Sequence, residues 1–229
     1  MTESDTQPFT DADAAAILAV WFGEHSLTAG APAPPDMVQQ WFLGTPEFRR
    51  TCAGFGALLA DLGAAYAPAT IAGAARTPAR ALALLVLLCP LARILFSATP
   101  AEASIYRVLD PLAEALAAHA LDPARRWDLG VDGEWKASPA ARMWFLLPGG
   151  NSEVLAVQEK TVRDADEVVK DAGAVVGGVW DGNRVAEAMN LRRFLLGRCE
   201  EVRVWGRMRE RDAVLGREVA DESIEGVML

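Results

Sequence analysis

The sequence contains few of the residues that most often carry catalysis or bind metal ions. Its 229 residues include only two histidines and three cysteines, and Cys52, Cys89 and Cys199 form no Cys-x-x-Cys pair. Structural zinc sites need four Cys or His ligands at short spacings, and a Ser-His-Asp set needs a suitably placed histidine. Neither a P-loop nor a Gly-x-Gly-x-x-Gly motif occurs. The sequence therefore predicts no metal site and no cofactor.

Positive charge is also scarce. Lys and Arg number 22 against 31 Asp and Glu, so the formal net charge is −9 at pH 7. Nucleic acids and anionic membranes bind basic surfaces, so this balance argues against both as partners. The well-separated cysteines fit reduced thiols, and the acidic opening MTESDTQPFTDAD lacks the basic region and apolar core of a signal peptide. We expect a cytoplasmic protein.

One long apolar run, ALALLVLLCPLA, stands between Arg80 and Arg93. Its twelve residues are too few to cross a bilayer, which takes about 20 apolar residues. Pro90 interrupts the run as well. The run therefore predicts a buried core helix, and the sequence predicts no membrane span.

Ser/Thr-Pro pairs mark the starts of several helices. Thr45, Thr77, Thr99 and Ser138 each precede a proline, which places a hydroxyl at the N-cap and the proline at the first helical position. The pattern predicts one all-α domain over residues 1–229, an array of about eight or nine antiparallel helices behind a disordered tail at 1–10. The predicted helices lie near 11–22, 34–43, 46–65, 78–96, 100–119, 139–147, 151–171, 183–203 and 211–226.

Five segments, taken in order, resemble the family catalogued as domain of unknown function 924. They are 15–22 (AAILAVWF), 41–42 (WF), 80–99, 142–160 (RMWFLLPGGNSEVLAVQEK) and 205–218 (WGRMRERDAVLGRE). The likeness extends over residues 14–225. It implies an all-helical array similar to tetratricopeptide-repeat (TPR) proteins, in a divergent member of a family without an agreed activity.

The departures from the family pattern concern hydrogen-bonding groups. Where the family reads Leu-Asp-Gln-Phe-Pro-Arg-Asn, this chain reads LCPLARI at 88–94, so Arg93 is kept while Cys89 and Ile94 replace the Asp and Asn. A family His-Ser-Glu triplet is Asn-Ser-Glu at 151–153, and Pro-His-Arg-Asn is Arg-Glu-Arg-Asp at 209–212. The resemblance thus implies a family pocket that has become apolar here.

Two polar groups near these positions have two interpretations each. Arg93 lies among apolar neighbours and needs acceptors, either in a salt bridge to Glu153 or Glu159 or in a substrate carboxylate or carbonyl. Asn151 and Glu153 follow two glycines, where they would cap a helix or face a pocket as a donor and an acid/base.

Aromatic residues and arginines supply the remaining candidates. Four of the seven tryptophans lie in the family-like segments, and we expect them near a central cavity. The arginines between 192 and 217 alternate with acidic residues, which is typical of a solvated face; an anion site would use Arg207, Arg211 and Arg217. Cys89 is expected to be an inert thiol in its apolar setting.

Two functions of different classes follow. The first is a cofactor-independent enzyme acting on an apolar terpenoid- or polyketide-like molecule in secondary metabolism, a cyclase or isomerase whose most specific form is Diels–Alder-type ring formation. The second is a non-catalytic TPR-like scaffold that binds a peptide or protein in a groove. The first assigns catalysis to Arg93, Asn151 and Glu153. It assigns substrate binding to Trp21, Phe22, Trp41, Cys89, Ile94, Trp144, Gln158, Trp205 and Arg211.

Overall fold

A computed structural model describes residues 8–28, 30–176 and 180–218. Within these ranges the protein is all-α and has no strand, as the sequence predicted. Nine of the described helices have seven or more residues. They are α1 (Asp11–Phe22), α2 (Pro35–Leu43), α3 (Pro46–Cys52), α4 (Gly56–Ala65), α5 (Pro78–Val86), α8 (Asp110–Ala120), α9 (Pro139–Gly150), α10 (Leu155–Ala172) and α11 (Gly182–Trp205).

The apolar run forms the central helix of the fold. Residues 78–96 comprise α5, a π-helical turn at Leu87–Leu91, and α6 (Ala92–Phe96). Pro90 lacks the N–H of a regular helical turn, and the wider turn accommodates it. Pro78–Phe96 is the one helix in the described ranges long and apolar enough to span a membrane, yet 78% of its apolar window is buried inside the protein. It is a core helix.

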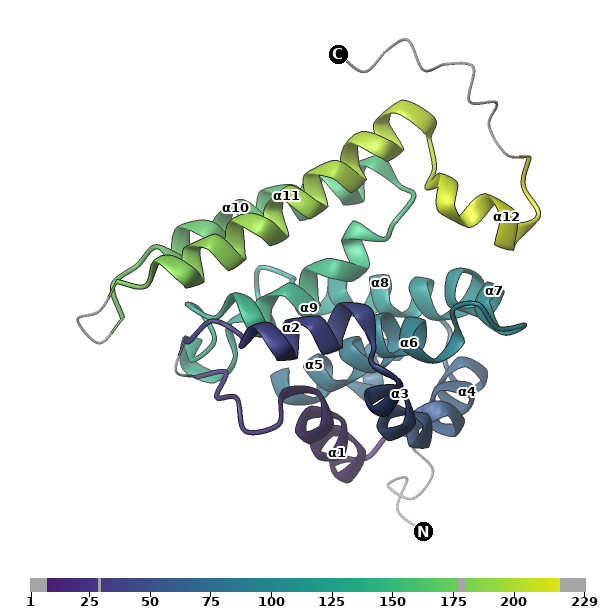
Figure 1. The fold of residues 1–229 in the computed structure, drawn as a ribbon, viewed down its shortest axis with the longest axis horizontal. Helices are drawn as coiled ribbons and strands as arrows, with labels where there is room; N and C mark the ends of the chain where they lie inside the picture. Colours follow the sequence, from purple (N-terminus) through teal and green to yellow (C-terminus); the bar gives the residue numbers. More distant parts are fainter. Residues whose placement is uncertain (1–7, 29, 177–179, 219–229) are drawn as a thin grey trace.

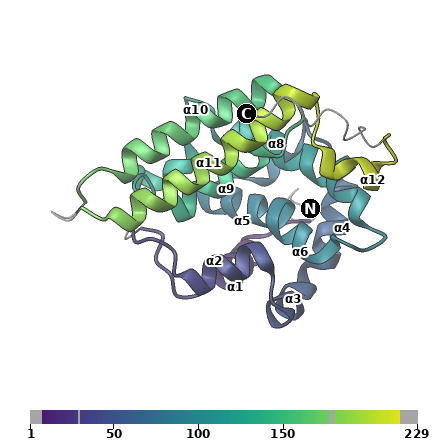
Figure 2. The same ribbon diagram turned by 45° about the horizontal axis from the view of Figure 1, so that its top comes forward.

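From α8 onward, the long helices that follow one another along the chain pack side by side. Helix α1 packs on α5, α5 contacts α8 and α9, and α8, α9, α10 and α11 then pack in succession. The long hairpin of α10 and α11 covers one side of the molecule, whereas α1 and α2 lie on the opposite side (Figures 1 and 2). This order is consistent with a TPR-like array of helical hairpins.

The end of α9 brings the hairpin close to the core. A Cβ added to Gly149 would lie 2.2 Å from Oγ1 of Thr161 in α10, and one added to Gly150 would lie 2.3 Å from Cδ2 of Leu195 in α11. The two glycines therefore allow α10 and α11 to approach α9 at the point where the chain turns toward residue 151.

Three predicted helix starts have the expected caps. The hydroxyls of Thr45, Thr77 and Ser138 accept hydrogen bonds from backbone N–H groups three residues later. At Thr99 the prediction is only partly right, because its hydroxyl accepts from Ala101 N at 3.2 Å and the short α7 (Glu102–Ser104) begins later.

Four predicted boundaries were wrong. The helix predicted at 46–65 is interrupted by a 3₁₀ turn at Ala53–Phe55, next to two glycines that do not favour an uninterrupted helix. Helix α9 continues through Pro148 to Gly150, so Asn151 ends a helix and α10 begins only at Leu155. Helix α12 (Asp212–Leu215) ends early at a left-handed Gly216, and residues 219–226 lie outside the described ranges.

Part of the segment predicted as a tail belongs to the fold. Residues 1–7 lie outside the described ranges, but Phe9 is buried and its carbonyl accepts a hydrogen bond from Nη2 of Arg80 at 2.6 Å. Thr10 caps α1 through a capping box with Asp13. The fold therefore includes Phe9 and Thr10, which precede α1.

Candidate functional site

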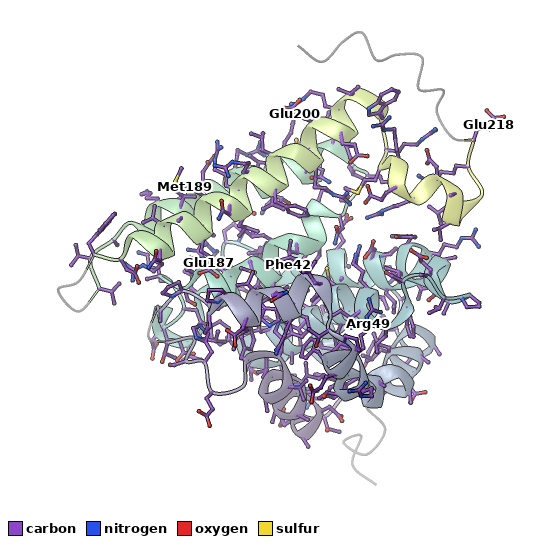
Figure 3. The ribbon with its side chains drawn as sticks, in the orientation of Figure 1. Phe42, Arg49, Glu187, Met189, Glu200 and Glu218 are labelled. Atoms are coloured by element: carbon purple, nitrogen blue, oxygen red, sulfur yellow. The ribbon has the colours of Figure 1, made fainter. Side chains whose placement is uncertain are left out.

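A pocket of about 340 Å³ lies among α2, α3, the π-helical turn with α6, α9 and α11. Figure 3 places Phe42 and Arg49 on the α2–α3 side of this region, and Met189 and Glu200 on the outer face of α11. The pocket combines an apolar wall with several guanidinium groups. Its lining residues are Trp41, Phe42, Leu43, Arg49, Cys89, Pro90, Arg93, Ile94, Ser97, Leu147, Asn151, Phe194, Arg198 and Glu210.

Two π-helical turns position the polar groups at the base of the pocket. The first contains Cys89 and Pro90 and leads into α6, which carries Arg93. The second, Ile105–Leu109, precedes Asp110 and Pro111 at the start of α8, and the two turns contact each other. Each turn lies at a proline, whose missing N–H disfavours a regular helical turn. The sequence signal for both turns is thus a proline within a helical pattern.

Asp110 lies between two arginines. One of its carboxylate oxygens, Oδ2, is 2.9 Å from Nη2 of Arg93 and 3.2 Å from Nη2 of Arg211. Arg211 also donates to the Asn151 carbonyl at 2.6 Å, and its guanidinium lies over the Tyr106 ring, 4.8 Å from the centroid. Asp110 is therefore the buried partner of Arg93, and the predicted salt bridge to Glu153 or Glu159 was wrong.

Cys89 is a buried thiol with a polar neighbour. The Asn151 side chain donates to its Sγ at 3.3 Å, and Arg93 Nη1 lies 3.1 Å from the Cys89 carbonyl. Burial raises the pKa of the Cys89 thiol to about 11. The thiol is therefore protonated near neutral pH, as its apolar setting predicted, and it is a poor nucleophile.

Three of the four predicted tryptophans, Trp21, Trp41 and Trp144, form a cluster behind the pocket, and of these only Trp41 lines it. The Trp144 ring meets those of Trp21 and Trp41 edge-on, at centroid distances of 5.2 and 5.0 Å. Trp41 Nε1 donates to the Trp21 carbonyl at 2.8 Å, and Phe22 packs edge-on against Trp41. This buried cluster fixes the orientation of α2 and of the Phe42 side chain at the rim.

Four other predicted site residues lie outside the pocket lining: Arg211, which pairs with Asp110, and Gln158, Glu153 and Trp205. Gln158 is buried, and its amide donates to the carbonyls of Gly150 and Ser152, so it fixes the link between α9 and α10. Glu153 accepts from the Met208 backbone N–H at 3.0 Å and forms a two-bond ion pair with an arginine. Trp205 instead stacks with Arg209 at 4.5 Å.

The three arginines considered for an anion site do not form one. Arg207 pairs with Asp212, Arg211 with Asp110, and Arg217 with both carboxylate oxygens of Glu153 at 2.8 Å. Burial opposes ionisation of Glu153, but the Arg217 ion pair and the Met208 N–H outweigh it and lower its pKa. The Arg217 pair attaches the 207–217 segment to the residues before α10, and the Arg211 pair attaches it to the start of α8.

Several pocket residues were missed in the sequence. Phe42 is the second residue of the quoted Trp-Phe pair and Leu43 follows it. Phe194 and Arg198 occupy one face of α11 at a spacing of one helical turn. Asp110 gave a local signal, an acidic residue beside a proline within an apolar helix, but nothing in the sequence indicated its distance from Arg93. Within the described ranges no three Cys, His, Asp or Glu side chains are grouped so as to hold a metal ion.

The fold and the site define an all-α protein with a half-apolar, arginine-containing pocket. Residues 17–227 match the model of the family described as bacterial protein of unknown function (DUF924). The match covers nearly the whole chain, so the chain belongs to this family, as the five segments predicted. No curated protein and no solved structure matches the chain.

Proposed function

We propose that the protein is a cofactor-independent enzyme that binds an apolar small molecule carrying an oxygen function in the pocket between α2 and α11. The cyclase or isomerase class, with Diels–Alder-type ring formation as its most specific form, agrees with the groups at this position. The supporting observation is the pairing of an apolar wall with Arg93, whose guanidinium is held by Asp110 and whose side chain is 27% exposed.

The positions of the polar groups favour polarisation over proton transfer. The Cys89 thiol is protonated near neutral pH, and Glu210 is engaged with Arg198 at 2.5 Å. Arg93 instead offers N–H donors that Asp110 holds in place, and such preorganised donors stabilise negative charge that develops on a carbonyl oxygen. An apolar wall adds orientation of the carbon skeleton, which by itself lowers the barrier of an intramolecular reaction.

The test compares two side chains of the same helix. Phe194 and Met189 both lie on α11 and are about half exposed, 47% and 49%, but only Phe194 lines the pocket. We expect Phe194→Ala to weaken the binding of a C10–C15 apolar ketone, measured by calorimetry, and Met189→Ala to leave it unchanged. Equal effects, or no binding to the unsubstituted protein, would contradict the proposal.

Turnover is then assayed as conversion at constant mass. Cyclisation and isomerisation change chromatographic retention but not mass, so linear polyene ketones are incubated with the protein and separated. We expect Arg93→Met to reduce the rate by about 10²-fold or more, as the loss of one oxyanion donor does elsewhere. Binding without conversion of any such ketone would contradict the catalytic part of the proposal.

A second candidate function is supported by the pocket rim. Phe42 and Leu43 are 55% and 69% exposed, and together with Phe194 they form an apolar rim open to solvent. A scaffold that inserts an apolar side chain of a partner peptide would use such a rim. A closed cavity lined by tryptophans would favour the enzyme over the scaffold. Trp21, Trp41 and Trp144 instead pack against one another in the core and do not enclose this pocket.

A further inference from the structure

We propose that the ligand of this pocket is an amphipathic acid, whose ionised carboxylate binds Arg93 and Arg49 while its apolar chain packs on the rim. This inference rests on the proposed function and names its substrate class. It follows from the balance of charges at the base of the pocket and from the surfaces that those charges reach.

The buried cluster at the base of the pocket has one positive charge in excess. Arg93 and Arg211 share the single carboxylate of Asp110, and both contact its Oδ2 atom. Cys89 contributes no charge near neutral pH, because burial raises the pKa of its thiol to about 11. A buried charge without a partner is costly, so an anion beside this cluster is favoured.

The other nearby carboxylates are already paired. Glu153 uses both of its oxygens for Arg217. Glu210, the one carboxylate that lines the pocket, lies 2.5 Å from Arg198, which is shared with Glu201 at 3.8 Å, and among the described residues neither glutamate forms an ion pair with Arg93. Neither group therefore supplies the missing negative charge to Arg93.

Arg93 is the member of the cluster that reaches the pocket. Its side chain is 27% exposed, whereas those of Asp110 and Arg211 are 9% and 5% exposed. It lines the pocket together with Arg49 of α3, which donates to the carbonyls of Gly44 and Ile94 at 3.1 and 2.5 Å and forms no ion pair within the described ranges. Two guanidinium groups without a full carboxylate partner therefore face the same pocket.

The surroundings of these arginines select an acid with an apolar chain. Phe42, Leu43, Leu147 and Phe194 supply a carbon surface beside the charges. The chain as a whole has a formal charge of −9, so positive charge at the pocket is a local feature that would bind an anion against the general field. A planar guanidinium matches a carboxylate in a two-bond geometry.

The experiment compares four probes of related shape by calorimetry with the full-length protein. Decanoate is the acid, decanol is the neutral analogue, decyltrimethylammonium is the cation, and a Leu-Glu-containing peptide tests the partner-protein alternative. We expect decanoate to bind at least about tenfold more tightly than decanol, because hydrogen bonds to a charged group are the stronger class. We expect no binding of the cation.

Variants assign the preference to the pocket. Arg93→Met leaves Asp110 paired with Arg211, so the protein should fold, and it should reduce the affinity for decanoate to that for decanol. Arg49→Met, at an exposed position, should also reduce the preference, and because it removes the hydrogen bonds to the Gly44 and Ile94 carbonyls its unfolding is measured alongside its affinity. Arg125→Met is the control, since Arg125 is exposed and does not line the pocket.

The failure of the inference differs from the failure of the proposed function. Equal binding of decanoate and decanol, or binding of the cation alone, would overturn the inference that the ligand is an acid. The proposal that the pocket binds an apolar molecule would stand. Binding of the peptide alone would overturn both in favour of the scaffold. Binding of decanoate that Arg93→Met and Arg49→Met leave unchanged would place the acid elsewhere and overturn the inference.

Discussion

The stability of the protein should depend strongly on the carboxylate of Asp110. Asp110→Asn keeps the shape of the side chain and removes its charge, leaving Arg93 and Arg211 close together without a carboxylate between them. Asp11→Asn is the matched control. Asp11 also pairs with a buried arginine, Arg80, at 2.8 Å, but its side chain is 88% exposed and that of Asp110 is 9% exposed.

The magnitude follows from the difference in burial. Breaking a buried pair by removing one partner costs about 3–5 kcal/mol, because the remaining charge is left unpaired in a low dielectric. An exposed pair contributes about 0–1 kcal/mol, because water screens both charges. Arg80 also retains the carbonyls of Phe9 and Ala74 as acceptors. For a chain of this size, 3–5 kcal/mol corresponds to a decrease in Tm of about 6–20 °C.

The stability of both variants is measured by urea unfolding at neutral pH, followed by circular dichroism. Urea is uncharged, so it does not screen the ion pairs. We expect Asp110→Asn to lower the urea midpoint at unchanged slope, and Asp11→Asn to change it little. Arg93→Met should cost less than Asp110→Asn, because Asp110 keeps Arg211. If Asp110→Asn loses no more stability than Asp11→Asn, or less than Arg93→Met, the charge balance inferred for the cluster is wrong.

Three further predictions concern α9 and α11. Burial raises the pKa of Glu187 to about 7 from 4.5, so the folded state binds this proton more tightly than the unfolded chain does, and stability falls as pH rises between these values. Glu187→Gln should reduce this pH-dependent fall in the free energy of unfolding by up to about 3 kcal/mol. The same pH dependence in the variant and in the unsubstituted protein would refute the prediction. Gly149→Ala, whose Cβ would crowd Thr161, should cost about 1–3 kcal/mol in thermal unfolding. The exposed helical Gly197 has nothing within 4 Å, so Gly197→Ala should stabilise by up to about 1 kcal/mol; a loss there would contradict the argument.

Local chemistry in the sequence predicted much of the fold. The hydroxyls before Pro46, Pro78 and Pro139 cap helices as expected, because an N-cap depends on residues three positions apart. The run after Arg80 is a core helix because burying its apolar side chains is favourable, and that property is also visible in the local sequence. Local signals failed where two glycines interrupt 46–65 and where α9 continues through Pro148.

The candidate site was less predictable. Arg93, Asn151, Cys89 and Ile94 do lie together at one pocket with Trp41. Their segments carried recognisable motifs. Trp205, Gln158 and Glu153 carried motifs too, yet Gln158 joins α9 to α10, and Trp205 and Glu153 contact the C-terminal segment.

The sequence by itself determined the helical class, most helix starts, the burial of residues 81–92 and the family, because each depends on nearby residues or on the order of motifs. Only the tertiary structure decided which carboxylate Arg93 pairs with and which side chains face the pocket. Arg93 and Asp110 are separated by 17 positions, and Asp110 and Arg211 by far more. Such pairings depend on how the helices pack and on the direction in which a π-helical turn points the side chains that follow it. Neither can be read from a short stretch of residues.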